Sequence, residues 1–148
     1  MLTPNRAAAD IFRAHGATAC TDVTGFGLAG HLLEMLRASG VTAALLLNAL
    51  PVLSGASETL KAGLFSSLHP QNLQAADFVD QTWINHPLYP LLFDPQTAGG
   101  LLAAVPKAAA SSCLAELHRQ GYTTAAVVGR VTAAADTAHA IVLSTEKE

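Results

Sequence analysis

The run from Cys20 to His31, CTDVTGFGLAGH, constrains this chain more than any other segment. A short apolar stretch leads into the carboxylate of Asp22 and the hydroxyls of Thr21 and Thr24, and glycines then open a helix. A helix start offers free backbone N–H groups and the positive end of the helix dipole. A carboxylate there repels phosphate, but it can hold a divalent cation such as Mg2+ that binds phosphate. The run therefore predicts half of a metal–phosphate site.

A purely structural interpretation of the same run is also open. Thr24 would be the N-cap of the helix, and Asp22 would interact favourably with the helix dipole. The glycines would then serve close packing between backbone segments. Residue types alone do not decide between a capped helix and a metal–phosphate site.

The spacing of apolar residues along the chain predicts an α+β fold, a mixed β-sheet with helices packed on it. We expect Leu28, Leu32, Met35 and Leu36 to form the core-facing stripe of the second helix, which Gly40 ends. The last two strands are expected to form a hairpin around residues 133–137. The predicted helices cover residues 4–15, 25–39, 55–62, 72–79 and 107–120, and the predicted strands cover 17–21, 41–47, 89–93, 101–105, 125–131 and 138–143.

The composition limits the kinds of partner that this chain is expected to bind. The 148 residues suffice for one domain with a real core. Charged residues make up 13% of the chain, against a usual share of about 25%. We therefore expect an apolar face that packs on another domain or on a second copy. The net charge of −3, without blocks of like charge, argues against nucleic acid and anionic membranes as partners.

The cysteines and the apolar runs indicate a cytoplasmic protein. The 2 cysteines, Cys20 and Cys113, show no metal-binding spacing and fit a reducing compartment. Polar residues and proline interrupt the first residues, so no secretory signal is expected. The longest apolar stretch, residues 41–53, is too short to span a bilayer.

Two motifs together resemble the signatures of one family. Residues 19–31, ACTDVTGFGLAGH, resemble the ACTDVTGFGLxGH signature of selenide, water dikinase (selenophosphate synthetase). Residues 92–102, LFDPQTAGGLL, resemble its LxDPQTSGGLL signature, with Ala98 where serine is usual. Residues 63–72 are similar to the family's glycine/serine loop that ends in asparagine, and residues 121–131 look like its closing strands. The resemblance covers nearly the whole chain.

The resemblance implies a fold and a larger protein. The family belongs to the aminoimidazole ribonucleotide synthetase-like ATP-using enzymes, whose members have two domains, and both signatures lie in the second. Residues 1–148 are thus expected to be a single C-terminal domain of a larger two-domain or fused enzyme. The N-terminal domain, with its glycine-rich arm and its Cys or selenocysteine near a Lys, is not recognisable here. The intact protein would be a dimer, and this chain alone would be inactive.

The resemblance also implies a reaction and a set of site residues. The family transfers the γ-phosphoryl of ATP to selenide with Mg2+ present, giving selenophosphate, AMP and orthophosphate. Asp22 would be this domain's metal ligand, and no catalytic residue would lie in this domain. The residues expected to bind ATP or its phosphates are Thr21, Thr24, Gly25, Gly27, Asp94, Gln96 and Thr97.

Two reactive side chains near the first motif have simpler explanations. Cys20 ends an apolar strand, so we expect a small buried thiol and not the family's nucleophile. His31 and Glu34 lie three residues apart on one helix face and could ligate a metal. The pair offers two ligands and no evident third, which favours a hydrogen-bonded structural histidine.

The loop residues outside the first motif leave their roles open. Residues 94–100 could line the nucleotide or a domain interface, or could form a tight turn with close-packed glycines. Asn72, Ser66 and Ser67 could line the site, although hydrogen bonding within the loop is the simpler expectation. A non-catalytic scaffold or regulatory module derived from the same domain is the alternative to the enzymatic function.

Overall fold

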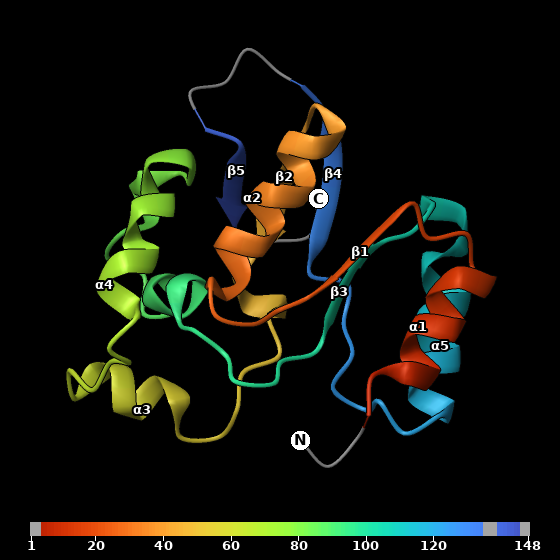
Figure 1. Ribbon diagram of the computed structural model, residues 1–148, viewed down its shortest axis with the longest axis horizontal. Helices are drawn as coiled ribbons and strands as arrows, with labels where there is room; N and C mark the ends of the chain where they lie inside the picture. The colour runs from red at the N-terminus through yellow and green to blue at the C-terminus, as the bar shows by residue number, and fades with distance from the viewer. Residues whose placement is uncertain (1–3, 135–138, 146–148) are drawn as a thin grey trace.

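The computed structural model describes residues 4–134 and 139–145, and within these residues it shows an elongated arrangement of helices around two β-sheets (Figure 1). The helices are α1 (Arg6–Ala14), α2 (Gly27–Ser39), α3 (Ala56–Lys61), α4 (His69–Asn72) and α5 (Ala110–Arg119), and the strands are β1 (Ala19–Asp22), β2 (Val41–Leu46), β3 (Leu101–Ala104), β4 (Gly129–Ala133) and β5 (Ile141–Ser144). The 3₁₀ helices are η1 (Leu47–Ala49), η2 (Leu73–Phe78), η3 (Gln81–Trp83), η4 (Tyr89–Phe93) and η5 (Lys107–Ala109). No helix among these residues is long and apolar enough to cross a bilayer.

The strands form one mixed sheet and one antiparallel pair. In the three-stranded sheet the order is β4-β2-β5, with β2 antiparallel to β4 and parallel to β5. The second sheet pairs β1 with β3 antiparallel, from Ala19 opposite Ala104 to Asp22 opposite Leu101. Together with the helices that cover the sheet, this arrangement confirms the predicted α+β class.

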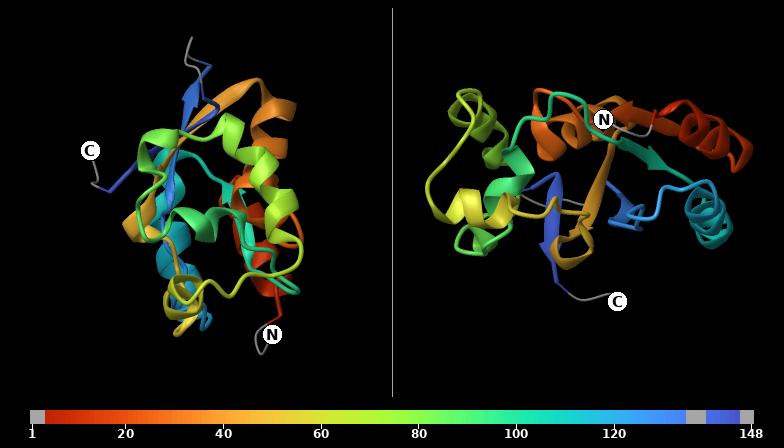
Figure 2. Two further views of the ribbon diagram at one scale, coloured as in Figure 1. Left: turned by 90° about the vertical axis from the view of Figure 1, so that its left-hand side faces the viewer. Right: turned by 90° about the horizontal axis from the view of Figure 1, so that it is seen from below.

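Two hydrophobic clusters hold the fold together. The larger cluster joins α2, η4 and the sheet, and it contains Leu32, Leu36 and the fully buried Phe93. The smaller cluster packs α1 on α5 through Ile11 and Leu117. Figures 1 and 2 show α1 and α5 at one end of the molecule and α3 and α4 at the other, with the β1–β3 ladder running between the two clusters.

The predicted stripe on α2 and the predicted helix end at Gly40 are largely confirmed. Leu32 and Leu36 are buried, whereas Leu28 and Met35 are partly buried. Gly40 has φ +63°, and its amide donates to the Arg37 carbonyl, as a left-handed helix cap requires.

The strand predicted over residues 89–93 is wrong, because this segment forms the 3₁₀ helix η4. Pro90 occupies its first turn and has no N–H to donate to a strand ladder. The amides of Leu91 and Asp94 instead donate to the carbonyls three residues before them. The apolar run reflects burial in the core and not an extended backbone.

The hairpin predicted from the last two strands is also wrong, because β2 lies between β4 and β5. β2 has ladder partners on both edges, so it is the central strand of the sheet, and its residues are buried or partly buried. β4 begins at Gly129, four residues later than predicted, and a Cβ at that position would overlap the Ala44 carbonyl oxygen. Residues 135–138, which include most of the expected turn, lie outside the described residues.

Helix boundaries differ from the predicted ones by a few residues. α1 begins at Arg6 and not at Pro4, and the predicted helix 107–120 begins with the 3₁₀ turn η5 before α5. The helix predicted over residues 72–79 is the pair α4 and η2, which starts three residues earlier.

Candidate functional site

The two sequence motifs meet in space at one end of the β1–β3 ladder. The Val23 amide donates to the Gly100 carbonyl at 2.9 Å, and the Gln96 amide donates to the Thr24 carbonyl at 3.0 Å. We call residues 22–27 and 94–100 the paired loops. The fold thus joins the predicted site residues of both motifs in one structure, although they are far apart in the sequence.

Close contact between backbones explains two of the glycines. A Cβ at Gly27, which has φ +69°, would lie 2.9 Å from the Phe93 carbonyl carbon. A Cβ at Gly99 would overlap the Val23 carbonyl oxygen. Side chains at either position would push the paired loops apart, so the packing interpretation of the glycines is correct for these two.

The Asn72 side chain connects the first of the paired loops, residues 22–27, to the core through hydrogen bonds. This buried side chain donates from Nδ2 to the Gly25 carbonyl at 2.8 Å and to the Phe93 carbonyl at 3.0 Å. Of the two roles left open for Asn72, hydrogen bonding within the fold is the one the contacts support. Asn5 was missed by the sequence reasoning; its Nδ2 donates to the Gly99 carbonyl at 3.1 Å, and no sequence signal marked it.

Replacing Asn72 with alanine is expected to lower the free energy of unfolding by about 2–3 kcal/mol, since the buried Phe93 carbonyl and the partly buried Gly25 carbonyl lose their donor. Urea denaturation measures the change. Asn48→Ala is the control, because Asn48 is exposed and its side chain reaches only the Thr145 carbonyl at 3.5 Å. Equal stability of the two variants would contradict the role given to Asn72.

Thr24 and His31 form a structural pair. Thr24 Oγ1 lies 3.1 Å from Nε2 of the buried His31, whose Nδ1 lies 3.5 Å from Glu34 Oε2. The contacts match the expected hydrogen-bonded histidine. Thr24 is not the N-cap of α2: the helix begins at Gly27, and the residue before it, Phe26, makes no capping hydrogen bond through its side chain.

Asp22 lies exposed at the end of β1. The Thr21 hydroxyl donates to the Asp22 carbonyl at 3.2 Å, and within the second loop Gln96 Nε2 donates to Asp94 Oδ2 at 3.1 Å. Within the described part of the chain, no group of three or more His, Cys, Asp or Glu side chains is arranged to hold a metal ion. Any metal site at these loops would need further ligands in addition to Asp22.

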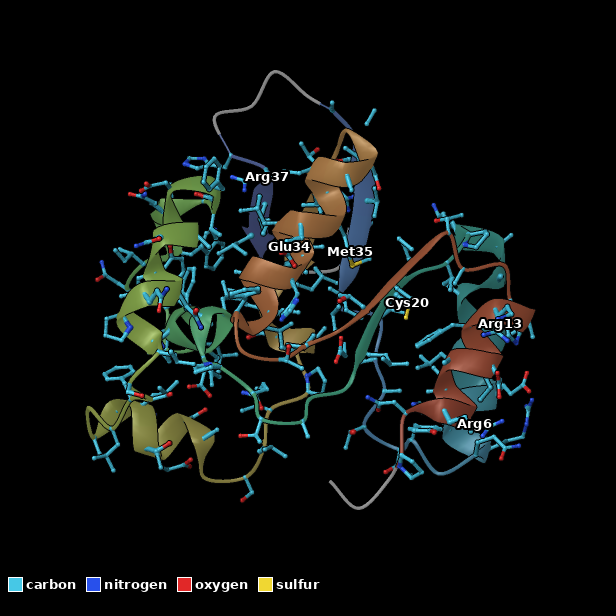
Figure 3. All side chains as sticks on the ribbon, viewed as in Figure 1. Arg6, Arg13, Cys20, Glu34, Met35 and Arg37 are labelled. Carbon is cyan, nitrogen blue, oxygen red and sulfur yellow. The ribbon has the colours of Figure 1, made fainter. Side chains whose placement is uncertain are left out.

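The prediction that Cys20 is buried is wrong, because its side chain is exposed. The β1–β3 ladder has only two strands, and alternation puts Cys20 on the same open face as Asp22. Figure 3 shows the Cys20 side chain beside this ladder. Partial burial, together with the Asp22 charge, raises the pKa of the thiol. A raised pKa disfavours the reactive thiolate, which agrees with the rejection of Cys20 as nucleophile.

Cys113, the other cysteine, is buried in the smaller cluster.

An open apolar hollow of about 2050 Å3 lies alongside the paired loops. Its lining includes Leu28 and Met35 of α2, Leu101 of β3 and Val128. Small-molecule pockets usually measure about 300–1,000 Å3. The size and the apolar lining therefore suit contact with another folded unit better than a small ligand.

The fold and the paired loops together define the class of this protein. It is an α+β domain in which the two glycine-containing loops present one exposed carboxylate, that of Asp22. Residues 1–141 match the family described as "AIR synthase related protein, C-terminal domain", and the chain belongs to this family.

Individual relatives agree with this assignment. The chain is 40% identical over 119 residues to a selenide, water dikinase of Trichlorobacter lovleyi, covering 76% of this chain and 33% of that protein. It is 37% identical over 143 residues to a selenide, water dikinase of Porphyromonas gingivalis, covering 96% and 41%. The chain thus spans about a third to two fifths of these relatives. The crystal structure of the hydrogenase maturation protein HypE has the same fold, with a TM-score of 0.62, 21% identity, and coverage of 95% of this chain and 38% of that one.

Proposed function

We propose that this domain completes the ATP- and Mg2+-binding site of a selenide, water dikinase, which makes selenophosphate, AMP and orthophosphate from selenide and ATP. The observation that carries the proposal is the meeting of the two motifs at the paired loops, with Asp22 exposed at their edge. The similarity to selenide, water dikinases over most of this chain supports the choice of reaction.

In this proposal Asp22 contributes one carboxylate to a shared metal site. Mg2+ is commonly held by one or two protein carboxylates together with water and substrate phosphates, so a single exposed aspartate fits such a role. Bound Mg2+ would neutralise phosphate charge during transfer of the γ-phosphoryl group. The remaining carboxylates and the group that accepts selenide would come from an N-terminal domain.

The other proposed ligands differ in how freely they could contact a nucleotide. The Thr24 hydroxyl is held by His31, and the Gln96 amide is held by Asp94, so both have fixed positions beside the loops. The Gly27 amide already donates to the Thr24 carbonyl at 3.1 Å, so Gly27 contributes mainly to the turn. Thr21, Gly25 and the exposed Thr97 remain proposed contacts to ATP or its phosphates.

The apolar hollow supports a partner unit in this proposal. Its volume of about 2050 Å3 and its position beside the paired loops suit the N-terminal domain of the same enzyme. Such packing would bring further ligands next to Asp22 and exclude water from the phosphates. A homodimer of a cytoplasmic enzyme is the assembly that we propose.

A chimera tests the proposed function. In the Porphyromonas gingivalis relative, these residues would replace the matched segment, and AMP formation would be followed with and without selenide. We expect selenide-dependent AMP formation by the chimera and none by the 148-residue chain alone, since most of the site would be missing. Selenide-dependent turnover by the chain alone would contradict the proposal, and a folded chimera that binds no Mg2+–ATP would favour the non-catalytic module.

A further inference from the structure

A second hollow lies on the side of the molecule formed by α4, η2 and η3, and none of its lining residues belongs to the paired loops. It measures about 410 Å3, within the range of small-molecule pockets. Phe65, Leu73 and Ile84 at its rim are exposed, at 47%, 42% and 58%. Its lining comprises Phe65, His69, Leu73, Ala76, Gln81, Ile84, Tyr89 and Pro90.

Two buried polar groups of this lining lack hydrogen-bond partners. His69 is 5% exposed and Tyr89 is 3% exposed. Neither His69 Nδ1 nor the Tyr89 hydroxyl has a hydrogen-bond partner in the described part of the chain. An unpaired buried polar group costs free energy, and such groups are rare in native proteins. Two of them in the lining of one apolar hollow indicate that a bound molecule completes their hydrogen bonding.

The chemistry of the lining limits what that molecule can be. Phe65 packs on His69 with ring centroids 4.6 Å apart, so the lining already contains a pair of packed rings, a setting that suits an aromatic ligand. Burial lowers the pKa of His69 and raises that of Tyr89, so both groups are neutral near pH 7. The negative charges of Asp94 near His69 and Asp80 near Tyr89 disfavour an anionic ligand.

We propose that this hollow binds a small, uncharged aromatic molecule with a hydroxyl or amide group, which hydrogen-bonds to His69 and Tyr89. Both polar atoms expose less than 1 Å2 in this structure, so Phe65 and the other rim side chains must move aside before the ligand can reach them. None of the residues that line this hollow belongs to the paired loops, although the charge of Asp94 acts on His69. α4 nevertheless connects the two regions, because it carries both His69 and Asn72, which holds the first of the paired loops.

Phenol is the probe for this site, and toluene is the matched probe without a hydroxyl. Phenol added to the 15N-labelled chain should shift the backbone amide signals of Leu73, Ala76 and Ile84 with a Kd of about 1 mM, as expected for so small a ligand. Toluene should bind at least fivefold more weakly. No saturable shifts with phenol up to about 10 mM would overturn the proposal and leave buried water as the partner of the two groups.

Tyr89→Phe and Tyr122→Phe form the matched pair of variants. Tyr122 lies near α1, where its hydroxyl donates to the Pro4 carbonyl at 2.7 Å and accepts from the Ala8 amide at 3.1 Å. Without ligand, we expect Tyr89→Phe to melt at or slightly above the wild-type temperature, because an unpaired buried hydroxyl is removed. The same variant should bind phenol about fivefold to tenfold more weakly. Tyr122→Phe should melt earlier and bind phenol normally. Equal phenol affinity in wild type and Tyr89→Phe would overturn the proposal, as would unchanged binding in Ala76→Leu, which narrows the hollow.

Discussion

Replacing Gly99 with alanine is expected to lower the free energy of unfolding by about 2–4 kcal/mol, because the new methyl group would overlap the Val23 carbonyl oxygen. The φ of Gly99 is not in the left-handed region, so backbone strain does not explain the effect. The paired loops must separate to relieve the overlap, and the hydrogen bond from the Val23 amide to the Gly100 carbonyl would lengthen. Urea denaturation of the 148-residue chain measures the loss.

Gly100→Ala is the matched control in the same loop. A Cβ at Gly100 meets no atom within 4 Å, and its φ is also outside the left-handed region. This variant should stay within about 0.5 kcal/mol of the wild type. If the two variants lose equal stability, the effect comes from glycine content in general and not from contact between the loops.

Replacing Asp22 with asparagine should reduce selenide-dependent AMP formation by the intact enzyme or the active chimera roughly 10²-fold or more, about 2.7 kcal/mol in barrier height. Asparagine keeps the size of the side chain but removes its negative charge, and the proposed metal site loses one anionic ligand. Asp22 is exposed, so the change should leave the folding stability nearly unaltered. Raising the Mg2+ concentration should recover part of the activity, because a weaker site fills at higher metal concentration.

Glu58→Gln is the control for Asp22→Asn. Glu58 is an exposed carboxylate on α3, outside the paired loops, and its loss should leave activity and Mg2+ dependence unchanged. Wild-type activity and metal dependence in Asp22→Asn would refute the metal role of Asp22. An equal loss in both variants would indicate a general effect of surface charge.

The site could be predicted from the sequence where the motifs are local. The glycine and threonine spacing around Asp22 indicated a strand, a loop and a helix start, and the structure has all three. The exposure of Cys20 could not be predicted from its neighbours in the sequence. It depends on how many strands lie beside β1, and the sheet of β1 and β3 has two strands. The contact of Asn72 with Gly25 and Phe93 depends on distant segments of the chain, and residue type alone left its role open.

The fold could be predicted where periodicity and capping agree, as for α2 and Gly40. The fold could not be predicted where an apolar run contains a proline. Residues Tyr89–Phe93 are apolar, as in a buried strand, but they form a 3₁₀ helix. The order of the strands in the sheet also could not be predicted from local sequence patterns. β4 and β5 follow one another in the sequence, which suggests a hairpin, yet β2 from far upstream separates them.

The central place of β2 has a consequence for the synthesis of this protein. Thr42 of β2 and Thr132 of β4 share a hydrogen bond although they lie 90 residues apart, and β5 is closer still to the end of the chain. The ribosome synthesises the motif around Asp22 before β4 and β5, but α2 packs on a core that contains Ile141 and Leu143. Both paired loops therefore leave the ribosomal exit tunnel before β4 and β5 do, and the core that supports the loops becomes complete only after β5 has emerged.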